Sequence, residues 1–594
     1  MGKHRGRHAR GGIALVWSAF AVLVVAMTTY IGFMLSQSAN SAANTNQNRL
    51  VASVRSESAT LQAMEEIEVI LQSGGDVPDN GVATVDGVDV AYTITQIGSP
   101  VEETDPTTSL QATISYFGIE AVAEVGGVRD TTRRIVRVSM IYAFQFAVFL
   151  ENDLIVFAQA DTEINGPVHV NGDMYLHTFR DLIFDTNYVA TAGEIHFDPP
   201  YSSWGNYSWW LRDPEIRRWV ADPYDTSEPV EFEDLEYESS FAGIDNNSDG
   251  DYDDWGEVKP FAPYALEQFE EPDFYNGGTG NTLTTAAHGT GTLDLPTVED
   301  LAMFQELEDG DWVWNESTEE YVEVTPGTGT HQKSSYHREA DLSILSYPDG
   351  SWRAFTNNGT EVTSSMASAV TATSMFDAYQ ASDAGDPDGE IQNTIIDLDE
   401  LGSSGYFPDN GLLYVAGYGA GDGLDVKGFQ LSNGSELADD LTVVSPNSIY
   451  VKGDYNTVNK KAASVIADAV SVLSNSWDDD TDHDSSPSAI ASDTTYNMSV
   501  VAGDIEPTSS GWVIVGNILR RHERWTGRDE NFNGSIVSHG YSQYATARPF
   551  TNWNGGPGYR PPYRRWNYDV ALNDANNQPP FTPRIVKVSD AAIW

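Results

Sequence analysis

The chain has 594 residues, which is more than one compact core holds and indicates two to four folding units. It carries 88 acidic and 32 basic side chains, a formal net charge of -56. A field of that sign repels phosphate backbones, so we expect no nucleic-acid partner. The absence of cysteine excludes disulfides, thiolate zinc sites and cysteine nucleophiles from the chain.

The N-terminus begins with a basic segment, residues 1–12, which contains Lys3, Arg5 and Arg7. An uncharged apolar run follows from Ile13 to Leu35, and as a helix it would span roughly 34 Å, enough to cross a bilayer core. The basic residues predict that this tip stays in the cytoplasm and that the remainder lies outside, in the periplasm or beyond the cell. A cleavable secretory signal is the alternative, although the run is longer than the usual apolar core of about 7–15 residues.

The helix is expected to continue beyond the membrane, because no proline or glycine occurs between Gly32 and Gly74. Spacings of three, four and seven residues place the following apolar side chains on one helical stripe: Leu50, Val54, Leu61, Met64, Ile67 and Leu71. Gly74 and Gly75 supply a stop. We therefore predict one transmembrane and amphipathic helix over residues 13–75.

A basic leader, Gly12, an apolar helix and an amphipathic continuation together resemble a type IV prepilin, especially the PilX-type minor pilins. The resemblance implies peptidase cleavage between Gly12 and Ile13 and packing of the helix against other pilin-like subunits. Trp17 stands where major pilins carry a glutamate at the fifth mature position, which favours a minor, tip or merely anchored role. An ordinary signal anchor remains the alternative.

After the helix, residues 76–150 alternate apolar and polar side chains, as in Val88–Ile94, and predict a small antiparallel sheet packed on the helix as a headpiece. The apolar run Met140–Leu150 is too short to span a membrane as a helix and is expected to be a buried strand. The fold class is therefore mainly β with a long N-terminal helix.

Residues 151–200 and 401–594 show short strands separated by Asn-Gly turns. This regular spacing predicts a β-helix-like or β-roll-like domain with a C-terminal α/β part. An irregular acidic insertion is expected at 201–400. An amphipathic helix is expected over Lys460–Ser474. The arginines at 520, 521, 524 and 528 are expected to pair internally with acidic groups.

The insertion contains the opening of an EF-hand-type calcium loop. Its candidate ligands for a structural Ca²⁺ ion are Asp245, Asn247, Asp249, Asp251 and Asp253. The match breaks at the twelfth position, where Gly256 replaces the bidentate glutamate. A solvated acidic loop is the alternative.

An aromatic cluster precedes this loop and could form a platform for a sugar or a partner protein: Trp204, Tyr207, Trp209 and Trp210. The same side chains could equally fill the core of the insertion. No nucleophile elbow, phosphate loop or zinc-protease motif occurs, so we expect no enzyme, although two distant carboxylates could still make a glycosidase. The sequence predicts a membrane-anchored surface protein with a structural or adhesive role. The alternative is a signal-anchored carbohydrate-binding or carbohydrate-active β-helix protein.

Overall fold

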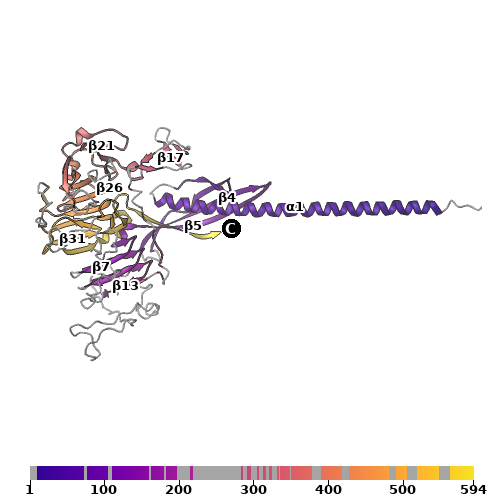
Figure 1. Ribbon diagram of the computed structural model, residues 1–594, viewed down its shortest axis with the longest axis horizontal. Coiled ribbons are helices and arrows are strands. Elements are labelled where there is room, and N and C mark those ends of the chain that lie inside the picture. Colours follow the sequence, from indigo (N-terminus) through magenta and orange to yellow (C-terminus); the bar gives the residue numbers. More distant parts are fainter. Residues whose placement is uncertain are drawn as a thin grey trace, which may run out of the picture.

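The computed structural model describes residues 10–72, 77–104, 110–158, 162–178, 182–186, 188–196 and 215–217, short pieces between 283 and 333, and then 335–347, 349–377, 390–417, 427–479, 490–504, 518–546 and 562–593. Within these ranges one long helix projects away from a β-rich body (Figure 1). An antiparallel sheet lies along the part of the helix nearest the body.

The helix α1 (Arg10–Gln72) is unbroken over 63 residues. Its length confirms the expectation of a single rod that carries the apolar run and the amphipathic segment together. It ends just before Gly74 and Gly75, where two residues without side chains favour termination.

The headpiece sheet has six strands in the order β1-β2-β4-β5-β34, with β3 paired to β4, and every pairing is antiparallel. The strands are β1 (Asn80–Val85), β2 (Val88–Gln96), β3 (Val101–Thr104), β4 (Gln111–Val125), β5 (Val128–Tyr142) and β34 (Arg584–Ile593). Asp86 and Gly87, both with positive φ, form the tight turn between β1 and β2. The headpiece, meaning this sheet with the second half of α1, confirms the expected antiparallel sheet on the helix.

The outer strand β34 comes from the far end of the described chain. It pairs with β5 along almost its whole length, from Arg584 opposite Tyr142 to Ile593 opposite Arg134. The prediction that residues 401–594 all belong to the second domain is therefore wrong for this strand. Sequence periodicity reports which face of a strand is buried but not which distant strand it pairs with.

The first half of the body is built from short strands that recur in three parallel sheets. One sheet has the order β13-β10-β7, a second β14-β11-β8, and the third contains β15-β12-β9-β6. Successive passes of the chain therefore add one strand to each sheet in turn. The strands are β6 (Val148–Leu150), β7 (Leu154–Ala158), β8 (Thr162–Asn165), β9 (Val168–Val170), β10 (Met174–Thr178), β11 (Leu182–Asp185), β12 (Val189–Thr191), β13 (Ile195–His196), β14 (Glu215–Arg217) and β15 (Leu283–Thr284).

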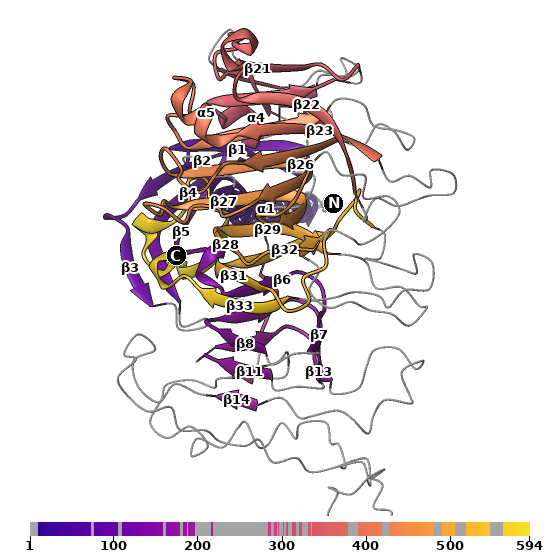
Figure 2. The same cartoon turned by 90° about the vertical axis from the view of Figure 1, so that its left-hand side faces the viewer.

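The second half of the body continues the third sheet through β6 into a 15-stranded, mostly parallel sheet. Eleven of its strands follow the order β15-β12-β9-β6-β32-β29-β27-β26-β24-β20-β21, and the other four branch from this path: β25 pairs with β26, β23 with β25, β22 with β23, and β30 with β27. Figure 2 shows β26, β27, β29, β32 and β6 of this sheet stacked one below another, above β8 and β11. The added strands are β20 (Leu342–Ser346), β21 (Trp352–Thr356), β22 (Val370–Phe376), β23 (Glu390–Asp397), β24 (Leu412–Gly417), β25 (Lys427–Ser432), β26 (Leu441–Lys452), β27 (Ala463–Leu473), β29 (Ser499–Asp504), β30 (Leu519–Arg521) and β32 (Ile536–Tyr541).

Smaller elements surround this sheet. A parallel three-stranded sheet contains β28 (Thr494–Asn497), β31 (Asp529–Gly534) and β33 (Tyr563–Tyr568). Two antiparallel pairs are β16 (Phe304–Glu306) with β19 (His331–Lys333) and β17 (Trp312–Asn315) with β18 (Glu320–Glu323). The short helices are α4 (Ser335–Glu339), α5 (Leu398–Ser403), η1 (Ala143–Gln145), η6 (Thr363–Met366), η7 (Val570–Asn573) and η8 (Ala575–Asn577).

Two sequence-based expectations fail in this half. The predicted amphipathic helix at Lys460–Ser474 is wrong, because the segment contains strand β27, which is buried along its whole length. A strand covered on both faces carries a nearly continuous apolar run and cannot be told from a helix by periodicity. The insertion boundary at 400 is also too late, because β20 pairs with β24 and β23 pairs with β25 inside the large sheet.

The run Met140–Leu150, expected to be one buried strand, is divided into the end of β5, the turn η1 and β6. Its side chains join an apolar core between headpiece and body that includes Ile114, Phe144, Phe149, Tyr414, Val444 and Ile585. A separate core lies on the other face of the large sheet and includes Met174, Phe184, Leu413, Val443, Val465 and Val500. The headpiece is therefore joined to the body by packed apolar surface as well as by the chain.

Candidate functional site: the anchoring helix and its seat on the headpiece

The first half of α1 exposes its apolar side chains. Its most apolar window has a mean hydropathy of 2.0 and no part of that window is buried, and among the described residues α1 is the one helix long and apolar enough to cross a membrane. Phe20, Val22 and Leu35 are between 58% and 69% exposed. Exposed apolar area costs about 25 cal/mol per Å² in water, so this half requires an apolar environment, whether lipid or other helices.

The second half of α1 is held close to the sheet by small side chains. Ala52, Ala59 and Ala63 are fully buried on one helix face, together with Ile67. They meet the inward-facing side chains of the sheet, which include Val90, Tyr92, Ile94, Phe117, Ile119, Val136 and Val138. Alanine at these positions lets the helix axis approach the larger sheet residues without a void.

The stripe deduced from the sequence is therefore divided between two surfaces. Met64, Ile67 and Leu71 pack against the sheet, whereas Leu50 and Val54 are exposed, as is Leu61. The face formed by Ala52, Ala59 and Ala63 contributes more to the helix–sheet interface than the sequence pattern indicated. The exposed leucines and valine leave an apolar strip on the opposite side of the helix.

A polar group connects α1 to the edge strand β34 and to its neighbour β5. Arg134 on β5 is only 3% exposed, and its Nη1 donates to both carboxylate oxygens of Asp590 on β34 at 2.6 Å. Its Nε donates to the hydroxyl of Thr60 on α1 at 3.3 Å. A buried guanidinium is costly unless it is paired, so this contact fixes helix, β5 and β34 relative to one another.

Two further polar contacts lie along the same seat. The hydroxyl of Ser56 on α1 is 2.7 Å from that of Thr132 on β5. The hydroxyl of Tyr92 donates to the carboxylate of Glu66, which also belongs to α1. Burial, and then this neighbouring carboxylate, raise the pKa of Tyr92 well above its usual range, so the hydroxyl stays protonated and continues to donate.

The sequence-predicted site residues are placed as follows. Gly12 and Ile13, the candidate cleavage pair, lie in the first turns of α1. The calcium-loop residues Asp245–Asp253 and the aromatic platform Trp204–Trp210 lie outside the described residues. Among the described residues no group of three His, Asp or Glu side chains lies close enough together to hold a metal ion.

The body contains a buried polar network that no sequence motif revealed. The hydroxyl of Ser471 lies 3.0 Å from Nε2 of His522, and Nδ1 of His522 lies 3.8 Å from Asp377, which also accepts a hydrogen bond from Tyr450. The order serine, histidine, aspartate resembles a hydrolase triad. However, Ser471 is 1% exposed and the His522–Asp377 separation exceeds a hydrogen bond, so the arrangement serves to satisfy buried groups.

A buried ion pair lies nearby. Arg521 donates through Nε and Nη2 to Glu530, and both side chains are essentially inaccessible. Burial alone would raise the pKa of Glu530, but the charge and hydrogen bonds of Arg521 outweigh it and hold that pKa below its ordinary value. This pair confirms, for Arg521, the expectation that the C-terminal arginines are neutralised internally.

No known family model and no curated protein matches the chain. Among solved structures, the competence-associated pilin ComZ from Thermus thermophilus is similar over 91% of this chain and 97% of that chain, at 11% sequence identity and a TM-score of 0.27. A likeness this weak supports no inference about fold or function. What the chain shows by itself is an exposed apolar N-terminal helix whose distal half is built into an antiparallel sheet.

Proposed function

We propose that the chain is a single-pass membrane protein of the type IV pilin kind, anchored by α1, that displays its β-rich body outside the membrane in a structural or adhesive role. One observation carries the proposal. The first half of α1 is exposed and apolar, whereas its second half packs against an antiparallel sheet. A soluble protein would gain nothing from such a rod. A subunit that must leave the bilayer or pack against neighbouring helices needs it.

The partners that this arrangement favours are lipid and other pilin-like subunits. The exposed strip of Leu50, Val54 and Leu61 continues the apolar surface past the membrane, where neighbouring helices would cover it. Trp17 in place of an acidic residue favours a minor, PilX-type or tip position over a place in the repeating filament. The role is structural, and we propose no catalytic activity.

We also infer that the body is a β-helix. The support is the repeated visit of the chain to three parallel sheets in a fixed order, and the apolar core that side chains such as Leu154, Val168 and Phe184 share. Such a body suits display, because its many backbone hydrogen bonds make an extended, rigid shape. Structural Ca²⁺ at Asp245–Asp253 remains part of the proposal, tested by whether chelation lowers the melting temperature of the full chain.

N-terminal sequencing of the native membrane protein tests the anchor. Processing at the candidate site gives a mature chain that starts at Ile13, and a Gly12→Leu variant should accumulate uncut while the matched Gly11→Leu variant is still processed. A start at Met1 in a protein that resists carbonate extraction indicates an ordinary signal anchor. A soluble protein that starts near Ala43 contradicts membrane anchoring altogether.

A further inference from the structure

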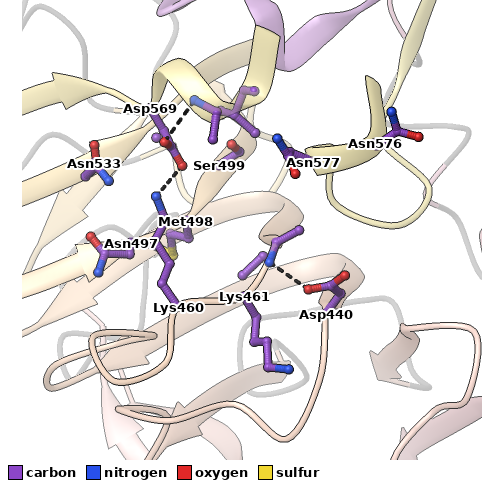
Figure 3. A pocket seen from close by; sticks show the side chains of 15 residues that line it. Asp440, Lys460, Lys461, Asn497, Met498, Ser499, Asn533, Asp569, Asn576 and Asn577 are labelled. Atoms are coloured by element: carbon purple, nitrogen blue, oxygen red, sulfur yellow. Dashed lines mark hydrogen bonds and ion pairs between the residues drawn. The ribbon is translucent and has the colours of Figure 1, made fainter. Parts of the chain in front are cut away.

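The body has a polar pocket where the parallel strands begin. Its volume is about 290 Å³, and it is lined by the turns before β26 and β27, the junction of β28 with β29, the end of β31, and the η7–η8 segment (Figure 3). Ligand pockets span about 300–1,000 Å³, so this one fits a small molecule or one unit of a larger one.

The pocket has an apolar floor and an open polar rim. Met498 and Leu572 are buried beneath it, and Asp440, Lys460 and Asn576 are exposed around it. Gly534 allows the wall to close on the floor, because a Cβ there would lie 1.9 Å from the carbonyl oxygen of Met498. An apolar floor under a polar rim is typical of ligand sites, in which the apolar lining contacts the ligand and a few polar groups fix its orientation.

The charges of the rim cancel one another. Lys460 pairs with Asp569, and Nζ of Lys461 lies 3.4 Å from Asp439. Asp440 accepts the backbone N–H of Ala462 at 2.8 Å. An anion entering the pocket would have to displace Asp569 from Lys460, and a cation would have to displace Lys460 from Asp569. The rim therefore disfavours charged ligands of either sign.

Amide groups supply the remaining hydrogen-bonding capacity. Asn497 uses its Nδ2 to hold the carbonyl of Asn456 at 3.0 Å. Within the part of the chain that the structure describes, the side-chain amides of Asn533 and Asn577 make no hydrogen bond, and each offers both donors and an acceptor. Hydroxyl groups are the ligand groups that match this mixture, because each one donates and accepts at once.

We propose that this pocket binds a neutral saccharide unit, with its hydroxyls on Asn533, Asn577 and the Lys460–Asp569 pair and its apolar face on Met498 and Leu572. The site is independent of the membrane helix, so it goes beyond the anchoring role. It gives the displayed body a chemical class of target, uncharged glycan. No sequence pattern indicated the pocket, because its residues come from turns far apart in the chain.

The test uses the full chain in a detergent without a sugar headgroup, since maltoside or glucoside detergents would compete. Neutral oligosaccharides of glucose, galactose and N-acetylglucosamine are screened on an array, with uronic-acid oligomers as the charged comparison. The best neutral binder is then titrated by calorimetry. We expect a Kd that changes little between about 0.05 and 0.5 M salt, because no net charge is neutralised.

The variant Asn533→Ala should weaken the Kd about tenfold, the effect of losing one or two hydrogen bonds. Its matched control is Asn531→Ala, on the same strand but outside the pocket, which should leave the Kd unchanged. Asn577→Ala, in an exposed turn, repeats the test where folding is least at risk, and melting curves check that all variants fold. Failure of every neutral saccharide to bind, stronger binding of uronic acids, or equal effects of Asn533→Ala and Asn531→Ala would each overturn the proposal.

Discussion

The headpiece and the body use β-strands in two different ways. Along β4 buried and accessible side chains alternate, because one face packs on α1 and the other meets solvent. Along β27 every side chain is buried, because the large sheet is covered on both faces. The headpiece sheet therefore depends on α1 to cover most of its apolar face, with a smaller part packed against the body, whereas the body carries its own core.

The two regions also differ in how far their ion pairs are exposed to solvent. The headpiece pair Arg134–Asp590 keeps its carboxylate 45% exposed, so solvent shares the cost of any change there. The body pair Arg521–Glu530 is closed off completely. Disturbing the body should thus cost more free energy than disturbing the headpiece, and four measurements test that ordering from the largest expected effect to the smallest.

The largest effect is expected from Glu530→Ala, which leaves Arg521 buried without its carboxylate and should lower the free energy of unfolding of the body by about 3–5 kcal/mol. Hydrogen exchange of peptides from β27 and β31 in the full chain measures it. The neighbouring Asp529→Ala breaks an exposed pair with Arg565 and should cost about 0–1 kcal/mol. Equal effects of the two variants would show that burial does not separate these pairs.

Acidification should weaken the body next. Burial lowers the pKa of His169 to about 4, so the unfolded chain, with an ordinary value of 6.5, binds the proton first as pH falls. Stability is therefore lost between about pH 6.5 and 4, by roughly 3 kcal/mol from this group. Urea unfolding across that range, compared with His169→Gln, isolates the contribution, because the variant should lose that part of the pH dependence. A variant curve parallel to that of the native chain would contradict it.

A smaller, local effect is expected where α1 meets the sheet. Ala59→Met places extra atoms in a fully buried position and should destabilise the headpiece by about 1–3 kcal/mol. Exchange should rise in β4 and β5 and remain unchanged in β26 and β27. Leu61→Ala, on the exposed side of the same helix turn, is the control and should change little. Faster exchange in the body after Ala59→Met would mean that the two regions unfold together.

The smallest effect is expected from Asp590→Asn, which removes the charge opposite Arg134 but keeps a hydrogen-bonding oxygen. Because Asp590 is half exposed, we expect a loss of about 1 kcal/mol, seen as faster exchange in β34 and β5. Glu120→Gln, which breaks a surface pair with Arg133, should have no measurable effect. A loss as large as that of Glu530→Ala would remove the distinction between the two regions.

The same contrast explains what could be read from the sequence. The alternating strands of the headpiece were predictable because each has one wet and one dry face, which leaves a period in the sequence. The helix α1 was predictable from its uncharged run and from the absence of proline and glycine between Gly32 and Gly74. Strand β27 was mistaken for a helix because burial on both faces erases that period. The pairing of β34 with β5 and the ion pair between Arg134 and Asp590 depend on contacts between distant segments, which no local pattern encodes.

The candidate sites divide similarly. The apolar helix was visible as a run of uncharged residues, and its end as two glycines. The pocket for which we propose saccharide binding could not be predicted, since Lys460, Met498, Asn533 and Asp569 come from four separate segments that meet only in the folded chain. The calcium loop and the aromatic platform stay predictions, outside the described residues.

The return of β34 to the headpiece has a mechanical consequence. Arg134 and Asp590 are 456 positions apart, yet they lie side by side next to the helix. The body is therefore inserted between two neighbouring strands of the headpiece sheet, and the chain connects the two regions twice. A single linker would let the body swivel about the rod. Two crossings restrict rotation of the body about the helix axis, and a force on the body is transmitted to the helix through β5 and β34 together.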